Sequence, residues 1–484
     1  MQSEILKLQP YHVWKYFDEI CKVPRPSKKE EKIIAYLLET GQKLGLETKR
    51  DKIGNVLISK PASKGKENVT PVVFQSHVDM VCEKNSDTVF DFNTDAIQPY
   101  IDGEWVKAKG TTLGADDGIG MAIALALLED NSIEHGPIEC LFTVDEETGL
   151  SGAFALEANF MKGKMLLNLD SEDEGQFFIG CAGGKDTIVK IDYQKQPVPA
   201  NTKAFSLSVK GLKGGHSGDD INKGLGNANK ILNRILYAGM YRYDIAISHI
   251  DAGNLRNAIA REGSAVVVVP EENSDRFVKF VEEFALTVKN ELHITDSEVE
   301  VKIAPTAMPN FVMDDFTQCD LVDAIYACPH GVLAMSQDIE NFVETSTNLA
   351  SIKMTDTQII ITTSQRSSVE SKKEEACNKV AALFGLIDAD IEHSEGYPGW
   401  NPNPQSELLN VLRQAYINLF KKEPLILAIH AGLECGLFAE KYPDMDMISY
   451  GPTLRCVHSP DEKLLIETVP QVWDLTVEFL KILE

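Results

Sequence analysis

The stretch IGMAIALALLEDNSIEHGPIECLFTVDEETG, residues 119–149, decides the fold class. It opens with an apolar helical segment at 119–128, continues through a polar connection, and enters a mostly apolar strand at 138–144 that ends in an acidic turn. A short continuous apolar strand is typical of a parallel sheet that is buried on both faces. A helix followed by such a strand therefore predicts an α/β layer.

Neighbouring segments extend this pattern in both directions. The further predicted elements are helices 29–44, 405–420 and 467–482 and strands 55–59, 71–75, 165–169, 425–429 and 445–450. They lie near the beginning and the end of the chain and share the same hydrophobic pattern, which is typical of buried helices and strands. We therefore expect residues 1–186 and 400–484 to form one α/β domain, a mostly parallel sheet with helices on both faces.

The middle of the chain, residues 187–399, has a different hydrophobic pattern. Its strands alternate apolar and polar residues, as in AFSLSVKGL at 204–212, which is typical of a sheet with one face in water. Twice, an asparagine (Asn257 and Asn348) precedes a strand and then a helix. This indicates a weak repeat of ~90 residues, although two strand–helix pairs can also resemble each other by chance. We expect an inserted α+β lid domain built from two similar units.

Composition narrows the class of partner and the compartment. Among 484 residues, 47 are Lys or Arg and 73 are Asp or Glu, so the formal net charge is −26. A surface this acidic repels phosphate groups, which argues against nucleic acid or an anionic membrane as the partner. The longest apolar run, 121–128, is far shorter than the ~20 residues of a membrane span. Nine cysteines without a C-x-x-C pair, and no secretory leader pattern in the first residues, predict a cytoplasmic protein.

Metal-capable side chains come after four of the predicted strands and before the next predicted helix, and a further acidic pair lies in a Gly-rich turn before a helix. In chain order these residues are His77 and Asp79, Asp116 and Asp117, Glu146 and Glu147, Asp170, and His458. Ligands of open α/β sheets gather beyond the carboxyl ends of the strands, so we expect these side chains to converge. Imidazole and carboxylate groups together suit zinc, manganese or cobalt.

A pair of metal ions that shares one carboxylate needs a further carboxylate that takes a proton from water instead of binding metal. The adjacent Glu146 and Glu147 offer one group for each task. Asp79, two residues after His77, can accept the second N–H of that imidazole and so fix its tautomer. Each cluster also has a simpler interpretation, because acidic pairs are usually solvated and DSEDEG at 170–175 is also typical of an exposed turn or a calcium loop. Their shared position after strands favours the metal site.

Six motifs, in this order along the chain, resemble those of a known enzyme family: QSHVDMV, GTTLGADDG, DEETG, NLDSEDEG, GLKGGHSG and CVHSPDE. They are similar to the aminoacyl-histidine dipeptidases, which are bacterial Xaa-His (carnosine-type) dipeptidases. That family belongs to the co-catalytic zinc peptidases, together with dipeptidase V, peptidase T and carboxypeptidase G. The likeness covers nearly the whole chain, including the large central insertion.

The resemblance implies a site for two divalent metal ions. His77 and Asp170 would bind one ion, Glu147 and His458 would bind the other, and Asp116 would bridge the two. Zn²⁺ is the expected metal, with Co²⁺ or Mn²⁺ as alternatives.

The resemblance also implies the groups that move protons and hold substrate. Glu146 would be the general base and acid, and Asp79 would orient His77. His216 would stabilise the oxyanion, although a structural histidine in a Gly-rich turn is the simpler interpretation. Asn257 and Arg366 would hold the substrate, Arg366 by its terminal carboxylate, unless it is a solvated strand-end arginine. A loop that closes the substrate pocket would comprise Gly432, Leu433 and Glu434.

The predicted activity is metal-dependent hydrolysis of short peptides, Xaa-His dipeptides above all, by an activated water molecule. Alternatives within the same superfamily are a tripeptidase and an amidohydrolase that removes an acyl group from an amino acid. A different class of function is a non-catalytic binding protein that keeps the fold. Short peptides are the expected partners, without nucleic acid or membrane, and pairing of lid domains into a homodimer is an expectation that rests on the resemblance.

Overall fold

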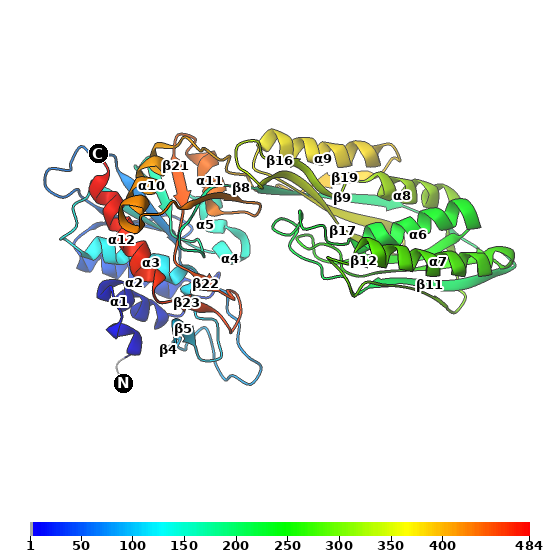
Figure 1. Cartoon of the computed structure of the whole chain (residues 1–484), viewed down its shortest axis with the longest axis horizontal. Coiled ribbons are helices and arrows are strands. Elements are labelled where there is room, and N and C mark those ends of the chain that lie inside the picture. The colour runs from blue at the N-terminus through cyan, green and yellow to red at the C-terminus, as the bar shows by residue number, and fades with distance from the viewer. Residues whose placement is uncertain (1–2) are drawn as a thin grey trace. The chain divides into compact units, whose positions relative to one another are not determined.

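The computed structural model describes residues 3–484 and divides into two compact units (Figure 1). Unit 1 comprises Met1–Gly180, Pro402–Ala428 and Leu433–Glu484, and unit 2 comprises Cys181–Asn401 and Ile429–Gly432. Unit 2 is thus inserted into the sequence of unit 1.

Unit 1 is built on an eight-stranded sheet. In spatial order its strands are β1 (Glu47–Arg50), β2 (Val56–Lys60), β6 (Ile138–Thr143), β3 (Val72–His77), β7 (Met165–Asn168), β21 (Asp446–Ser449), β8 (Gln176–Cys181) and β20 (Leu425–Ile429). The central strands β6, β3, β7 and β21 pair in parallel, whereas β1 with β2, β2 with β6, and β21 with β8 pair antiparallel. Every residue of β3, β6 and β7 is buried, which explains why these strands are mostly apolar. The predicted α/β layer is confirmed, with its parallel part at the centre.

Helices of unit 1 surround this sheet. They are α1 (Tyr11–Cys21), α2 (Glu31–Lys43), α3 (Ala115–Glu129), α4 (Glu146–Gly149), α5 (Ser151–Ala155), α10 (Glu407–Phe420), α11 (Glu434–Lys441) and α12 (Thr468–Ile482), preceded by the 3-10 helix η1 (Glu4–Lys7). Helix α3 packs against β3 and α1 and is buried on almost all sides, because its residues are nearly all small or aliphatic. Its first turn holds Asp116 and Asp117 in a non-helical conformation.

A four-stranded sheet that the sequence did not predict completes unit 1. In spatial order it contains β22 (Leu454–Arg455), β23 (Lys463–Leu465), β5 (Trp105–Ala108) and β4 (Pro99–Asp102). Strands β22 and β23 form a hairpin, and the loop between them, 456–462, carries His458. Because β23 also pairs with β5, both ends of this loop are anchored.

Unit 2 contains a nine-stranded antiparallel sheet. Its strands, in spatial order, are β14 (Glu300–Pro305), β11 (Thr202–Lys210), β13 (Gly263–Pro270), β12 (Ala246–Gly253), β17 (Val343–Met354), β18 (Gln358–Ser367), β9 (Gly183–Asp192) and β19 (Asp390–His393), with β16 (Gly331–Met335) paired to β17. The short strands β10 (Lys195–Gln196) and β15 (Val312–Met313) pair separately. Buried and less buried residues alternate along most of β11, as its sequence predicts.

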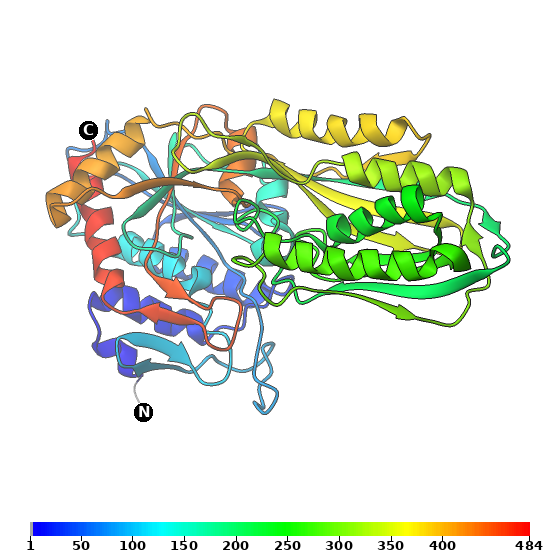
Figure 2. The same cartoon turned by 45° about the vertical axis from the view of Figure 1, so that its right-hand side comes forward.

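Four helices form one layer on this sheet (Figure 2). They are α6 (Ala228–Tyr243), α7 (Glu271–Glu291), α8 (Asp315–Ala327) and α9 (Glu370–Gly385). Their apolar residues and those of the sheet make a single core. No helix among residues 3–484 combines the length and hydrophobicity that crossing a membrane requires.

The sheet of unit 2 consists of two halves with the same order. From the middle outward, one half runs β12, β13, β11, β14 and the other runs β17, β18, β9, β19. In each half a helix, α7 or α9, connects the second strand to the outermost strand. The two halves join where β12 pairs with β17. This duplicated connectivity accounts for the weak repeat in the sequence.

Candidate active site

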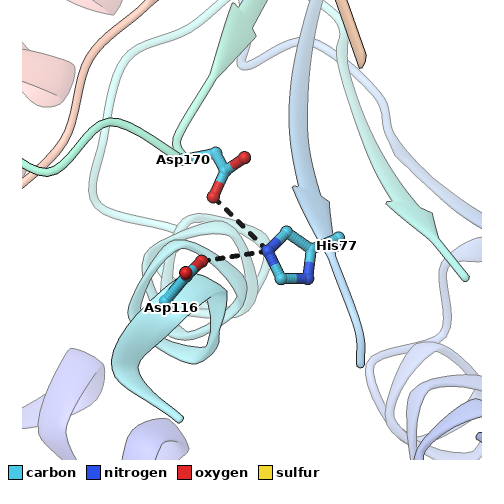
Figure 3. A group of neighbouring side chains, drawn as sticks. All are labelled: His77, Asp116 and Asp170. Atoms are coloured by element: carbon cyan, nitrogen blue, oxygen red, sulfur yellow. Dashed lines mark hydrogen bonds and ion pairs between the residues drawn. The ribbon is translucent and has the colours of Figure 1, made fainter. Parts of the chain in front are cut away.

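Three side chains from separate elements meet at the carboxyl ends of the central strands (Figure 3). His77 ends β3, Asp170 follows β7, and Asp116 lies in the first turn of α3. The Nε2 atom of His77 is 3.0 Å from Oδ1 of Asp116 and 3.4 Å from Oδ1 of Asp170. Because β3 and β7 run parallel as neighbours, the residues after them emerge at the same edge of the sheet.

Asp116 faces a second cluster through its other oxygen. The Nε2 atom of His458 is 3.1 Å from Oδ2 of Asp116 and 3.0 Å from Oε2 of Glu147. Within each cluster the candidate ligand atoms lie within 4.8 Å of one another. The structure thus brings together all five residues expected as ligands and places Asp116 between two candidate cation positions, with one oxygen toward each.

The donor set suits divalent cations. Within residues 3–484, no Lys or Arg forms an ion pair with Asp116, Glu147 or Asp170, so two imidazoles face three largely buried carboxylates. The Oε1 atom of Glu147 is buried without a hydrogen-bond partner. Buried carboxylates without enough positive charge are costly, and Zn²⁺ binds imidazole nitrogen and carboxylate oxygen. These residues therefore fit a pair of divalent ions.

The pKa values of the candidate ligands also favour bound cations. Hydrogen bonds with Asp116 and Glu147 raise the pKa of His458 to about 11. Burial raises the pKa of Asp170 to about 7, and the charge of Asp116 adds to this effect against the opposing influence of His77. Burial disfavours a charged His77, yet the neighbouring carboxylates raise the pKa of its imidazole well above the usual value. The carboxylates thus attract positive charge at both candidate positions.

Asp79 is fully buried and connects the two clusters. Its Oδ1 lies 3.4 Å from Nδ1 of His77 and accepts a hydrogen bond from the N–H of Glu146 at 3.0 Å. Its Oδ2 accepts hydrogen bonds from the N–H of Glu147 at 3.2 Å and from the hydroxyl of Ser27 at 2.7 Å. Burial alone would raise the pKa of Asp79, but the interaction with His77 and the hydrogen bond from Ser27 outweigh it and lower the pKa to about 2.

Glu146 shares a turn with Glu147 but belongs to neither ligand cluster. None of the residues that the structure describes donates a hydrogen bond to its carboxylate. Burial raises the pKa of Glu146 well above its usual value, and the charges of Asp170 and Glu434 add to this effect while His77 opposes it. A carboxyl group with these properties beside metal ligands is suited to proton transfer.

A third buried acidic group, Glu30, Asp79 and Asp145, adjoins this turn. Glu30 accepts a hydrogen bond from the N–H of Asp145 at 3.1 Å. Asp145 accepts hydrogen bonds from the hydroxyls of Thr148 and Ser151. These hydrogen bonds tie the group to the turn, so the group is part of the scaffold of the turn.

The residues expected to hold substrate converge separately, within unit 2. The N–H of Ser217 donates to the carbonyl of Asn257 at 2.8 Å. From the end of β18, Arg366 reaches the same turn, with Nη2 3.4 Å from Nε2 of His216 and Nε 3.3 Å from Oγ of Ser217. His216 and Asn257 also line one hollow of about 1210 Å³ on this unit.

Tyr397 contacts Arg366 and lies close to Gly432. Its hydroxyl accepts a hydrogen bond from Nη1 of Arg366 at 2.8 Å, and a Cβ added to Gly432 would lie 2.8 Å from its ring. Arg366 is 6% exposed, and no carboxylate in the described part of the chain lies within 4.0 Å of its guanidinium. Tyr397 lies just before the predicted domain boundary between residues 399 and 400 and was not predicted as a site residue. A buried arginine without a carboxylate partner is suited to an anionic ligand.

The predicted pocket-closing loop is divided between the two units. Gly432 falls in unit 2, whereas Leu433 and Glu434 fall in unit 1. Glu434 begins α11 and is 1% exposed, and its Oε2 accepts hydrogen bonds from Gln75 at 2.7 Å and Thr143 at 2.8 Å. Its side chain therefore links β3 and β6 in the interior of unit 1.

Comparison with known proteins is consistent with this geometry. The model of peptidase family M20/M25/M40 matches residues 73–481. The cytosol non-specific dipeptidase of Escherichia coli (strain K12) is 44% identical over 479 residues, which cover 99% of each chain.

Solved structures of other proteins superpose on nearly the whole length of this chain. The crystal structure of aminoacylhistidine dipeptidase from Vibrio alginolyticus superposes with a TM-score of 0.94 at 44% identity and covers 100% of this chain and 99% of the other. Aminopeptidase PepT from Bacillus cereus ATCC 10987 has a TM-score of 0.58 at 17% identity, with 98% of each chain covered, and shares the fold. The resemblance read from the six motifs is confirmed, and the chain belongs to peptidase family M20/M25/M40.

Proposed function

We propose that this chain hydrolyses short peptides, above all dipeptides, at a pair of divalent metal ions. The observation that carries the proposal is the position of Asp116, whose two oxygens face two separate clusters of histidine and carboxylate ligands. As a member of this peptidase family, the chain is a hydrolase acting on peptide bonds. The names of the Escherichia coli and Vibrio relatives, both dipeptidases, support the substrate class.

Five residues would hold the two ions. His77 and Asp170 would bind one ion, Glu147 and His458 would bind the other, and Asp116 would bind both. When bound, such ions lower the pKa of a coordinated water toward neutrality and polarise the scissile carbonyl. Zn²⁺ is the proposed metal, with Co²⁺ and Mn²⁺ as alternatives, because ligands of this kind accept all three.

Proton transfer would be the task of Glu146. Its carboxylate would accept a proton from the attacking water and donate it to the nitrogen of the leaving amine. The absence of a hydrogen-bond donor to this carboxylate among the described residues supports the role. Asp79 would keep Nδ1 of His77 protonated and so leave Nε2 free as a ligand.

Unit 2 would act as the lid domain and unit 1 as the catalytic domain. Arg366, supported by Tyr397 and Ser217, would bind the free carboxylate of the peptide, which would favour very short substrates. His216 would donate a hydrogen bond to the developing oxyanion. The remaining substrate contacts would come from Asn257 of the lid domain and from the pocket-closing loop of Gly432, Leu433 and Glu434. Buried Glu434 would act indirectly, through its hydrogen bonds with Gln75 and Thr143 in the sheet of unit 1.

Three narrower proposals rest on the relatives and the motif resemblance. A preference for histidine at the second position is suggested by the Vibrio relative's name, whereas the Escherichia coli relative is named non-specific. A cytoplasmic location is suggested by the word cytosol in the latter name. A homodimer formed through the lid domain rests on the motif resemblance.

The test is a substrate panel run on metal-stripped and metal-reconstituted protein. The panel contains Xaa-His dipeptides including carnosine, ordinary dipeptides, tripeptides and N-acyl amino acids. We expect hydrolysis of dipeptides that is lost on chelation and restored by Zn²⁺, Mn²⁺ or Co²⁺. Preferential cleavage of tripeptides or N-acyl amino acids would replace the dipeptidase proposal, and no turnover of any member after reconstitution would contradict peptide hydrolysis.

A further inference from the structure

Glu462 holds the turn that carries Asp116 by four backbone N–H groups. Its Oε2 accepts hydrogen bonds from the N–H of Leu113 at 2.7 Å and of Gly114 at 2.9 Å. Its Oε1 accepts hydrogen bonds from the N–H of Ala115 at 2.8 Å and of Asp116 at 3.3 Å. The first N–H groups of a helix lack acceptors within the helix. Here a carboxylate from a distant segment, only 2% exposed, is the acceptor for Ala115 and Asp116, which begin α3, and for the two residues before them.

Arg25 holds the same turn through a carbonyl group. Its Nη2 donates to the carbonyl of Gly114, and its Nη1 donates to the carbonyls of Val78 at 2.9 Å and Asp79 at 2.6 Å. The side chain is 3% exposed. Since Val78 and Asp79 follow β3 directly, one guanidinium connects the end of that strand to the turn that begins α3.

The surroundings of Arg25 are tightly packed. Gly114 has a φ of +67°, which favours glycine, and a Cβ at this position would lie 2.7 Å from Nη2 of Arg25. A Cβ at Gly118 would lie 2.7 Å from the same atom. The guanidinium therefore takes the space that side chains at these two positions would need.

We propose that Arg25 and Glu462 are positioning residues that fix Asp116 between the two candidate cation positions. This inference deepens the proposed metal-dependent function and rests on it. Glu462 lies four residues after His458 in the 456–462 loop, so its contact with the turn also positions that ligand. In the same way, the hydrogen bonds of Arg25 to the end of β3 position the turn relative to His77. Ligands from three distant segments must be aligned to about 0.5 Å for a shared carboxylate to serve two ions.

The charge of Arg25 and its positioning role make opposite predictions for the metal affinity of a variant that lacks it. Removing a buried positive charge near two divalent cations would strengthen metal binding by Coulomb's law. Loss of the hydrogen bonds that position Asp116 would weaken it. Glu462→Asp supplies the complementary case, because it keeps the negative charge but shortens the side chain by one methylene.

The experiment measures Zn²⁺ affinity of metal-free, full-length protein by competition with a chelator, and bound metal by elemental analysis. For Arg25→Gln and for Glu462→Asp we expect affinity to fall by roughly 10-fold to 100-fold, the range typical of residues that orient ligands. Because both residues act on one turn, the double variant should lose less than the sum of the two effects in free energy.

Two matched controls test for general damage to the interior. Glu139 is 4% exposed and accepts two backbone N–H hydrogen bonds at 2.7 and 2.9 Å. Lys60 is 5% exposed and donates to two backbone carbonyls at 2.9 and 2.6 Å. Neither belongs to a ligand cluster. Glu139→Asp and Lys60→Gln should lower the melting temperature of the metal-free protein while leaving Zn²⁺ affinity near the wild-type value.

Several outcomes would overturn the inference. These are unchanged Zn²⁺ affinity in both test variants, tighter binding by Arg25→Gln, or equal losses of affinity in the two controls. If Glu462→Asp does not fold, Arg25→Lys decides, because it keeps the charge and loses the fork of donors. A wild-type protein that binds no pair of divalent ions would instead contradict the proposed function, and the two failures are therefore distinguishable.

Discussion

The Nδ1 atom of His77 lies 3.4 Å from Oδ1 of Asp79, on the side of the ring opposite the nitrogen that faces Asp116 and Asp170. A carboxylate in this position favours the tautomer whose Nε2 is free to bind a metal. The same carboxylate accepts the N–H of Glu147, a ligand of the other cluster. One side chain that binds no metal itself thus prepares a ligand for each candidate position.

Asp79→Asn should weaken metal binding. The amide keeps the volume of the side chain, but it cannot satisfy His77 and the two backbone N–H groups of the glutamate turn together. We expect Zn²⁺ affinity to fall by about 10-fold to 100-fold, measured by chelator competition. Asp87→Asn, at an exposed position, is the matched control and should bind as the wild type does. Wild-type affinity in the Asp79 variant would contradict the role.

Asp116→Ala and Asp170→Ala should differ in metal content. Asp116 faces both clusters and Asp170 faces one. We therefore expect elemental analysis to find fewer than one equivalent of metal in the first variant and about one equivalent in the second, against two in the wild type, as expected for a two-metal site. Two equivalents retained by Asp116→Ala would rule out its bridging position.

Glu146→Gln should separate chemistry from metal binding. The amide cannot take a proton, and Glu146 lies outside both ligand clusters. We expect kcat for a dipeptide to fall by roughly 10² to 10⁴, with two equivalents of metal still bound. Near-normal turnover at full metal occupancy would show that another group is the base.

Arg366→Lys and Tyr397→Phe should raise KM more than they change kcat. A hydrogen bond to a charged group contributes about 1.5–3 kcal/mol, so losing the guanidinium fork should raise KM by at least about 10-fold. Removing the hydroxyl that supports Arg366 should weaken substrate binding by about 1 kcal/mol, which raises KM roughly 5-fold. A dipeptide with an amidated C-terminus is the control substrate, because wild type and variants should bind it equally weakly. A KM increase of the same size for the amide would contradict carboxylate recognition.

Acid should destabilise unit 2 through His330. Its Nδ1 accepts a hydrogen bond from the N–H of Leu349 at 3.3 Å, which requires a neutral ring. Burial, together with the charge of Lys230, lowers the pKa of His330 to about 4, from 6.5. The unfolded chain therefore binds a proton first, so this contribution to stability is complete above pH 6.5 and is lost as the pH falls toward 4.

At pH 5 this loss amounts to at most about 2 kcal/mol, at 1.36 kcal/mol for each pKa unit. His330→Asn offers a side-chain oxygen to the same N–H and does not titrate. Its free energy of unfolding, measured in urea, should fall less than that of the wild type between pH 7.5 and pH 5. Equal falls in the two proteins would contradict the assignment.

The central fold could be predicted because its signals are local. The strand predicted at 138–144 is observed at Ile138–Thr143, and the helix predicted at 467–482 is observed at Thr468–Ile482. Both have long apolar patterns that only burial explains. Strands of the small sheet, such as Leu454–Arg455, have two to four residues and mixed polarity, and neighbours distant in sequence decide their pairing.

The candidate ligands could be recognised because their side-chain chemistry and their place after strands are visible in the sequence. The supporting residues could not. Glu462 lies inside the CVHSPDE motif, yet its task is to accept N–H groups of a turn that only the folded chain brings near. Arg25 binds carbonyls and Tyr397 binds an arginine, and neither interaction leaves a pattern in the residues around it.

The duplicated sheet of unit 2 has a consequence for self-association. Its two halves join through β12 and β17, so the edges that the halves would otherwise expose are paired within one chain. The outer edges are the short strands β14, with sequence EVKIAP, and β19, with sequence DIEH. Charged residues and a proline on short border strands discourage the addition of strands from another molecule. Addition of a strand from a second copy is therefore disfavoured at the β14 and β19 edges of the sheet.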